Sequence, residues 1–257
     1  MFDTHLHTKF STDSKMSIDE ALKASIENNM GIIITEHMDL AFKSEGKFCF
    51  DPKSYFEKYM SYRNENLLLG IELGMEKERV KEAEEIIKNN PFDYVIGSIH
   101  TILEMDLYFD KFYDGKTKEE SYREYFNHMI YNLGKYDFID SLAHIDYVAR
   151  YNKYTDSEIY YEEFSYMIDE VLRILAKKEK SMEINTRRLK DKKALKNLVK
   201  IYKRFYELGG KTVTIGSDAH NPSDIGKNFK TAKEIAEFCK LKVVYYKDRK
   251  VFYDKNI

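Results

Sequence analysis

The amino-acid sequence predicts an α/β fold built on a parallel sheet, and two observations support this prediction. Short runs of apolar and β-branched residues alternate with longer segments in which apolar residues recur at helical spacing. Parallel neighbours in a sheet need crossover connections, so repeated strand–helix units indicate parallel strands. Seven such units fit a closed or nearly closed (β/α)7 barrel, similar to a TIM barrel, better than an open sheet.

Seven short apolar runs are the expected strands. They are Phe2–His7, Gly31–Glu36, Leu67–Leu73, Tyr94–Ile99, Phe138–Ala143, Ser181–Asn185 and Lys211–Gly216. The tail Val243–Tyr253 predicts an added hairpin of two short strands around Lys247 and Asp248.

The segments between these runs predict helices. They are Ser17–Asn29, Pro52–Asn64, Glu76–Asn89, Lys118–Lys135, Asp156–Lys178, Asp191–Leu208 and Phe229–Lys240. The first begins with a Ser-x-x-Glu capping box from Ser17 to Glu20, and Gly209 with Gly210 ends the sixth.

Length and composition limit the possible classes of protein. The chain has 257 residues, of which 43% are hydrophobic and 33% charged, as is typical of a globular protein with a sizeable core. No repeat or linker-like tract interrupts it, so we expect one domain over residues 1–257. The formal net charge of −2 argues against wholesale binding to nucleic acid or acidic membranes.

Cysteine usage and hydropathy predict a cytoplasmic location. Cys49 and Cys239 stand in no metal or redox spacing, which fits a reducing compartment. The sequence has no apolar run of about 18 residues that would span a membrane, and no leader-like apolar region at its start. We therefore expect neither nucleic acid nor membrane as a partner, and the sequence leaves the oligomeric state open.

Histidines gather where the predicted strands end. Six of the seven lie at, or within two residues of, the C-terminal end of a strand: His5, His7, His37, His100, His144 and His220. In α/β barrels these ends open onto one face, where active sites are built. His128 lies inside a predicted helix, and we interpret it as a packing or surface residue.

Three carboxylates join the histidines at these strand ends. Glu72 ends the third strand, Asp13 follows the first, and Asp218 stands two residues before His220. These nine donors exceed the four to six ligands of one ion, so we expect two or three divalent metal ions that share ligands. Bound cations would also relieve the repulsion between the carboxylates. The alternative is a polar rim with unrelated histidines.

Six motifs in order resemble those of the PHP (polymerase and histidinol phosphatase) superfamily. They are His5-Leu6-His7, Thr35-Glu36-His37, Gly70-Ile71-Glu72, Gly97-Ser98-Ile99-His100, Ala143-His144 and Ser217-Asp218-Ala219-His220. The resemblance implies a distorted seven-stranded barrel with a trinuclear metal centre at the C-terminal ends of the strands.

The resemblance also implies a division of the ligands among three ions. His5, His7, Glu72 and Asp218 would hold one ion, Glu72, His100 and His144 a second, and Asp13, His37 and His220 a third. Some relatives have histidine where Asp13 stands, and an oxygen ligand favours manganese or iron over zinc. Glu36 and Asp39 flank His37, and the sequence leaves open whether they orient it or are surface acids.

A centre of this kind suits hydrolysis of phosphate monoesters. It lowers the pKa of a bridging water, and the resulting hydroxide would be held by His5, His7, Glu72, Asp218 and His220. Arg150, Asn185 and Arg187 are the candidate phosphate-binding residues. The sequence does not decide which basic side chain reaches the phosphate.

The motifs Glu183-Ile184-Asn185-Thr186 and Gly97–His100 most resemble the histidinol-phosphatase branch. The leading hypothesis is therefore hydrolysis of L-histidinol phosphate to L-histidinol and phosphate in histidine biosynthesis. One alternative is a related phosphatase that acts on a nucleotide, a sugar phosphate or phosphotyrosine. Another, from a different class, is a non-catalytic metal-binding accessory protein.

Overall fold

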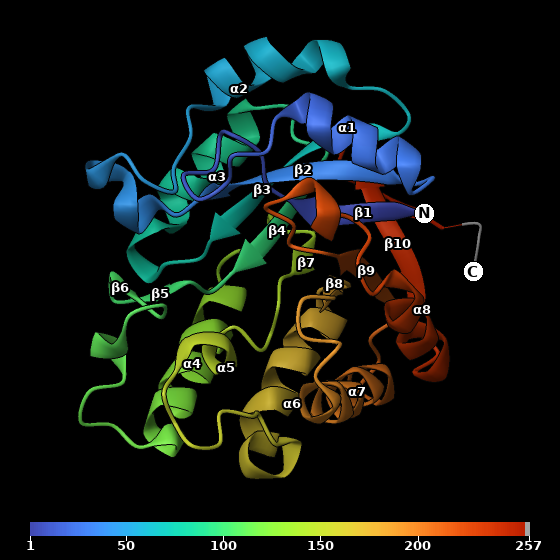
Figure 1. Cartoon of the computed structure of the whole chain (residues 1–257). Coiled ribbons are helices and arrows are strands. Elements are labelled where there is room, and N and C mark those ends of the chain that lie inside the picture. The colour runs from blue at the N-terminus through green and yellow to red at the C-terminus, as the bar shows by residue number, and fades with distance from the viewer. Residues whose placement is uncertain (255–257) are drawn as a thin grey trace.

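Parallel strands form the centre of the molecule, as the alternating pattern predicts (Figure 1). The computed structural model describes residues 1–254, apart from the side chains of residues 43–45. Within that range one sheet has nine strands in the order β1-β2-β3-β4-β7-β8-β9-β10-β11. The pairs from β1 to β10 are parallel, and only the last pair, β10 with β11, is antiparallel. The fold is therefore α/β with a mostly parallel central sheet.

The strands lie close to their predicted positions. They are β1 (Phe2–Leu6), β2 (Gly31–Met38), β3 (Leu67–Gly74), β4 (Tyr94–Ser98), β7 (Ser141–Leu142), β8 (Ser181–Asn185), β9 (Thr212–Gly216), β10 (Lys242–Lys247) and β11 (Lys250–Tyr253). A small hairpin of β5 (Thr101–Ile102) and β6 (Met105–Asp106) was not expected from the sequence. The fifth predicted strand, Phe138–Ala143, is shorter because the Ile139 N–H is used in a turn to the Tyr136 carbonyl.

Helices surround the strands, with α1 to α3 on one side and α4, α6 and α7 on the other (Figure 1). They are α1 (Ile18–Glu27), α2 (Pro52–Tyr59), α3 (Val80–Asn89), α4 (Lys118–Leu133), α5 (Val148–Tyr151), α6 (Tyr161–Lys177), α7 (Lys192–Glu207) and α8 (Phe229–Phe238). Short 3₁₀ turns cover Leu40–Glu45, Met60–Tyr62, Lys77–Arg79, Asp110–Phe112 and Pro222–Asp224. Among the described residues, no helix combines the length and the apolar character needed to cross a bilayer.

Local sequence signals explain where several helices begin. The predicted capping box is confirmed, since the Ser17 side chain accepts from the Glu20 N–H while Glu20 reaches back to Ser17. Helix α6 begins at Tyr161, later than predicted. The Asp156 carboxylate accepts the Glu158 N–H, and this local bond competes with helix formation.

The strands are buried on both faces, as is usual for parallel sheets covered by helices. In β2, Ile32 and Ile34 belong to the main core under the helices, whereas Ile33 between them faces a second apolar cluster. This second cluster includes residues of the tail strand β10 and consists of Phe2, Ile33, Leu68, Tyr94, Ile96, Ala143, Val244 and Tyr246. The predicted tail hairpin is confirmed, and its β10 also joins the sheet beside β9.

Strands β1 and β9 meet at their C-terminal ends. A parallel bridge joins Leu6 to Ala219, and the His7 N–H donates to the Ala219 carbonyl at 2.9 Å. The Asp218 N–H donates to the His5 carbonyl at 2.7 Å. These bonds bring together two segments that are more than 200 positions apart in the sequence.

Candidate metal centre

The cluster is organised around Glu72, a buried carboxylate near the end of β3. Its Oε2 atom lies 3.3 Å from His5 Nε2, 3.4 Å from His7 Nε2 and 2.9 Å from His37 Nδ1. Strand register explains the third contact, because His37 on β2 pairs directly with Glu72 on β3. His5 and His7 come from the end of β1, which is the other neighbour of β2.

The second oxygen of Glu72 contacts two further histidines. Its Oε1 atom lies 3.1 Å from His100 Nε2 and 2.9 Å from His144 Nε2. His100 follows β4 and His144 follows β7, the next two strands of the sheet. One carboxylate therefore has histidines from four strand ends around it.

Two aspartates flank the cluster. Asp218 Oδ1 lies 3.5 Å from His7 Nε2 and 4.0 Å from His5 Nε2. Asp13 Oδ2 lies 3.0 Å from His220 Nε2 and 3.6 Å from His37 Nε2, and its side chain is 41% exposed. Each of these two carboxylates thus lies beside a pair of histidines.

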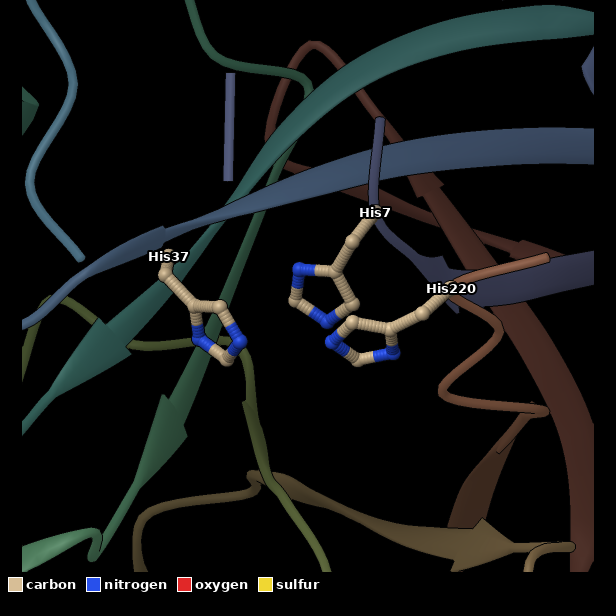
Figure 2. A group of neighbouring side chains, drawn as sticks. All are labelled: His7, His37 and His220. Atoms are coloured by element: carbon tan, nitrogen blue, oxygen red, sulfur yellow. The ribbon is translucent and has the colours of Figure 1, made fainter. Parts of the chain in front are cut away.

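Figure 2 shows His7, His37 and His220 turned toward one another. The ring centre of His7 is 4.1 Å from that of His37 and 4.3 Å from that of His220. Burial lowers the pKa of His7 well below its ordinary value, and the two neighbouring histidines lower it further. A neutral imidazole of this kind is suited to binding a metal ion.

Several of these atoms are buried without a hydrogen-bond partner in the described part of the chain. They include His5 Nε2, His7 Nε2 and Glu72 Oε2. Buried polar atoms nearly always have partners, so a set of buried atoms that face one another without a hydrogen bond indicates a ligand-binding site. Four groups of three donors have their atoms within 4.8 Å of one another: His5–His7–Asp218, His5–Glu72–His144, His7–His37–His220 and His37–Asp39–His100. These clusters are compatible with divalent metal ions.

Histidines and carboxylates of the cluster shift one another's pKa values. Burial alone would raise the pKa of Glu72, but His5, His100 and His37 hold it well below its ordinary value. Burial alone would lower the pKa of His5 and of His100, and the neighbouring carboxylates instead raise both well above their ordinary values. Metal binding must therefore displace histidine protons.

The candidate phosphate-binding arginines lie beside Asp218. Arg150 is largely buried, and its Nη1 donates to Asp218 Oδ2 at 2.7 Å. Its Nε and Nη2 are buried without a partner among the described residues. Arg187 Nη1 is 3.5 Å from the same Asp218 oxygen, and its side chain is 47% exposed. Arg187 also lines a cavity of about 250 Å³ together with Lys190, His220 and Lys227.

Two neighbouring side chains have partners within the protein. The Asn185 amide donates to Glu183 Oε2 at 3.1 Å, and its oxygen accepts the Arg187 N–H. Arg188 forms ion pairs with Asp146 at 3.0 Å and with Glu158. Arg150 and Arg187 offer charged N–H groups beside Asp218, whereas Asn185 uses one of its two amide N–H groups for Glu183.

Glu183 is the residue near the cluster that sequence reasoning missed. It is fully buried, and its Oε1 lies 2.7 Å from His5 Nδ1. The available signal was its place two residues before Asn185 on the same strand, which puts both side chains on one face. Glu36 and Asp39 are both buried, so the surface-acid interpretation is wrong for each.

His128 lies apart from the cluster, as predicted. Its Nε2 is 3.3 Å from the Met75 carbonyl oxygen, and 3.4 Å from Glu76 Oε2. Burial lowers its pKa below the ordinary value. It is a packing residue of helix α4.

An α/β protein whose parallel strands end in a buried cluster of histidines and carboxylates belongs to the broad class of proteins built to bind divalent metals. Residues 3–187 match the family model described as the PHP domain. The chain belongs to the PHP domain family, which confirms the resemblance seen in its motifs.

Two relatives and one solved structure are similar to this chain over most of its length. The probable histidinol-phosphatase of Clostridium acetobutylicum is 50% identical over 98% of this chain and 99% of its own. The histidinol-phosphatase of Lactococcus lactis is 35% identical over 85% of this chain and 83% of its own. A crystal structure of histidinol phosphate phosphatase from Lactococcus lactis, complexed with zinc, L-histidinol and phosphate, matches with a TM-score of 0.91, 30% identity and 98% coverage of both chains.

Proposed function

We propose that this protein is a metal-dependent phosphomonoesterase that hydrolyses L-histidinol phosphate to L-histidinol and phosphate, a step of histidine biosynthesis. The observation that carries the proposal is the set of five histidine nitrogens around the two oxygens of buried Glu72. The similar Lactococcus lactis structure holds zinc together with L-histidinol and phosphate. These two molecules are what hydrolysis of the monoester would release.

Two or three divalent ions, zinc, manganese or iron, fit the number and type of donors. We assign His5, His7, Glu72 and Asp218 to one ion, Glu72, His100 and His144 to a second, and Asp13, His37 and His220 to a third, and the contacts of Glu72, Asp218 and Asp13 are compatible with this division. When bound, such ions lower the pKa of water from 15.7 to about 7 and supply hydroxide for attack on phosphorus at neutral pH.

The protein's own contribution to phosphate binding comes from Arg150 and Arg187. Both guanidinium groups approach Asp218, which fixes them beside the cluster. Arg150 has buried N–H groups without partners, and such groups are strong donors to phosphate oxygens. Arg187 lines the adjoining cavity and would meet the phosphate or the departing alcohol from the solvent side. Asn185 would act by holding the backbone of Arg187 in place.

The strand arrangement supports a distorted (β/α)7 barrel as the frame of this site. The seven strands are β1 to β4 and β7 to β9, and the bridge from Leu6 to Ala219 supports closure between the first and the last. A main core that extends from Leu6 to Val243 supports a single domain. A cytoplasmic location fits the proposed biosynthetic role and two cysteines, Cys49 and Cys239, that stand in no metal or redox spacing.

A substrate panel tests the proposal. Purified protein loaded with zinc, manganese or iron is assayed against histidinol phosphate, nucleotides, sugar phosphates and phosphotyrosine. We expect the highest kcat/KM for histidinol phosphate. Preference for another substrate by more than about 100-fold, roughly 2.7 kcal/mol, would replace the substrate while keeping the chemistry. If the fully metal-loaded protein hydrolysed none of these esters, the proposal that it is an enzyme would be contradicted. The alternative of a non-catalytic metal-binding accessory protein would then be favoured.

A further inference from the structure

We propose that Glu183 and Asp39 are positioning residues for the metal centre. Each holds the Nδ1 atom of one histidine and thereby turns the Nε2 atom of that ring toward Glu72. Each also occupies a space that exists only because a neighbouring strand carries glycine at that point. The proposal rests on the proposed function, since it assigns these residues to the same metal site.

Glu183 is fixed by three donors. Its Oε1 atom lies 2.7 Å from His5 Nδ1, and its Oε2 accepts the His144 N–H at 2.8 Å and the Asn185 amide at 3.1 Å. A carboxylate accepts but does not donate, so a His5 ring that has given up its Nε2 proton for a metal ion would keep its remaining proton on Nδ1. The lone pair on His5 Nε2 then points toward Glu72 Oε2, 3.3 Å away.

Asp39 repeats this arrangement on the other side of Glu72. Its Oδ1 atom lies 2.9 Å from His100 Nδ1, and His100 Nε2 is 3.1 Å from Glu72 Oε1. Its Oδ2 atom is farther from a histidine, 3.7 Å from His37 Nδ1. Asp39 is buried, and its N–H donates to the Phe48 carbonyl at 2.6 Å, which ties down the backbone.

Glycines provide the space for both carboxylates. A Cβ atom on Gly216 of β9 would lie 2.2 Å from Glu183 Oε1 and 2.4 Å from His5 Cβ. A Cβ atom on Gly74, at the end of β3, would lie 2.0 Å from Asp39 Oδ1. Real Cβ contacts are essentially never shorter than 3.0 Å. Any other residue at either position would push the carboxylate away from its histidine.

Orienting partners of this kind contribute to metal affinity without touching the ion. A hydrogen bond from Nδ1 to a carboxylate fixes the tautomer and the ring plane and makes Nε2 more basic, and loss of such a partner typically costs about 10- to 100-fold in metal affinity. Because His5 and His100 approach different oxygens of Glu72, removal of either partner should weaken a different part of the centre.

The test compares D39A, D39N, G74A, the double variant D39A/G74A, E183A and E183Q with wild type. Zinc affinity is measured by competition with a chromophoric chelator, zinc per chain by elemental analysis, and ligand geometry from the absorption spectrum of the cobalt-loaded protein. Unfolding of the zinc-free proteins shows that each variant is folded. E119A, which removes an exposed carboxylate on α4, is the matched control and should bind zinc as wild type does.

We expect D39A to lower zinc affinity about 10- to 100-fold and to change the cobalt spectrum. D39N should recover much of the loss, because its amide oxygen can still accept the His100 Nδ1–H. G74A should match D39A, and the double variant should be no worse than either, because the three atoms nearest to the added methyl all belong to Asp39. E183A should lower zinc affinity in the same way, and E183Q should not recover the loss, because its NH₂ group would face at least one of three N–H donors.

The outcomes separate this inference from the proposed function. Zinc affinity in folded D39A and G74A within twofold of wild type, or additive losses in the double variant, would overturn the positioning role while leaving the phosphatase intact. Wild-type protein that holds less than one ion per chain after loading would contradict the proposed function itself.

Discussion

Carboxylates are buried at both ends of the parallel strands, but their charge is neutralised by different groups at the two ends. At the N-terminal end Asp93 is paired with Arg63 at 2.6 Å and accepts the N–H groups of Leu69 and Asp248. Asp140 at the same end is paired with Arg249 from the tail hairpin at 2.7 Å. At the C-terminal end the donors around Glu72 keep atoms without partners.

This difference shows how a structural charge pair can be told from a binding site. A buried charge is tolerated when it is paired and hydrogen-bonded, as Asp93 is by a fixed guanidinium and two backbone groups. Around Glu72 the compensating charges are histidine protons, which a divalent ion can replace. The N-terminal end, where the buried charges are fully paired, stabilises the fold, and we propose that the C-terminal end binds metal ions.

The largest expected effect is the loss of activity and bound metal when Glu72, at the C-terminal end of the strands, is substituted. Glu72→Gln keeps the size of the side chain but removes the charge that five histidines share. We expect kcat/KM to fall by at least about 1,000-fold, roughly 4 kcal/mol, with loss of bound metal. Steady-state kinetics and elemental analysis measure both, and activity within tenfold of wild type would show that Glu72 is not the shared ligand.

A change at the N-terminal end of the strands should lower stability but leave metal binding and catalysis almost unchanged. Arg63→Ala leaves Asp93 buried without its cation, so we expect the free energy of unfolding to fall by about 3 kcal/mol. Metal affinity and the kcat/KM of the folded protein should stay within about twofold of wild type. Denaturant unfolding with and without zinc measures the effect, and the variant Lys53→Ala on an exposed ion pair is the control.

If Arg63→Ala instead lowered metal content at unchanged stability, the proposed division between the two ends would be wrong. The same holds if the loss of stability disappeared in the presence of zinc, because a charge pair outside the site should not depend on the ion.

The smallest expected effect is the pH dependence of metal binding. Burial alone would lower the pKa of His5 and His37, but neighbouring carboxylates raise both well above their ordinary values, which favours the protonated form of each ring. Zinc must displace these protons. The apparent zinc affinity should therefore fall about tenfold for each unit by which the pH is lowered, per proton displaced. Calorimetry in buffers of different ionisation enthalpy should record proton release, whereas binding without it would contradict the assignment.

The sequence predicted the parts of the molecule that depend on local pattern. Apolar runs located the strands, and the rule that parallel strands end at one edge predicted that His5, Glu72 and His144 lie on the same face. The strands were easier to predict than the helix starts, because burial on both faces leaves a strong apolar signal, whereas the start of α6 depends on a local bond at Asp156.

Residues whose role depends on contacts across strands could not be predicted in this way. Glu183 acts on His5 from a strand 178 positions later in the sequence, and Gly74 matters only through its distance from Asp39. Arg188 and Arg187 look equivalent in the sequence, yet Arg188 is paired with Asp146 and only Arg187 lines the cavity. Side-chain partners of this kind require the packed structure.

The most direct test is a crystal structure of the metal-loaded protein with phosphate, with the ions located by anomalous scattering. We predict two or three peaks about 2.0–2.3 Å from the histidine nitrogens and carboxylate oxygens around Glu72, with the phosphate beside them. Glu72 should bridge two of the ions, with His5 and His144 on different ions. Anomalous peaks elsewhere, or a Glu72 carboxylate that contacts none of them, would contradict the account.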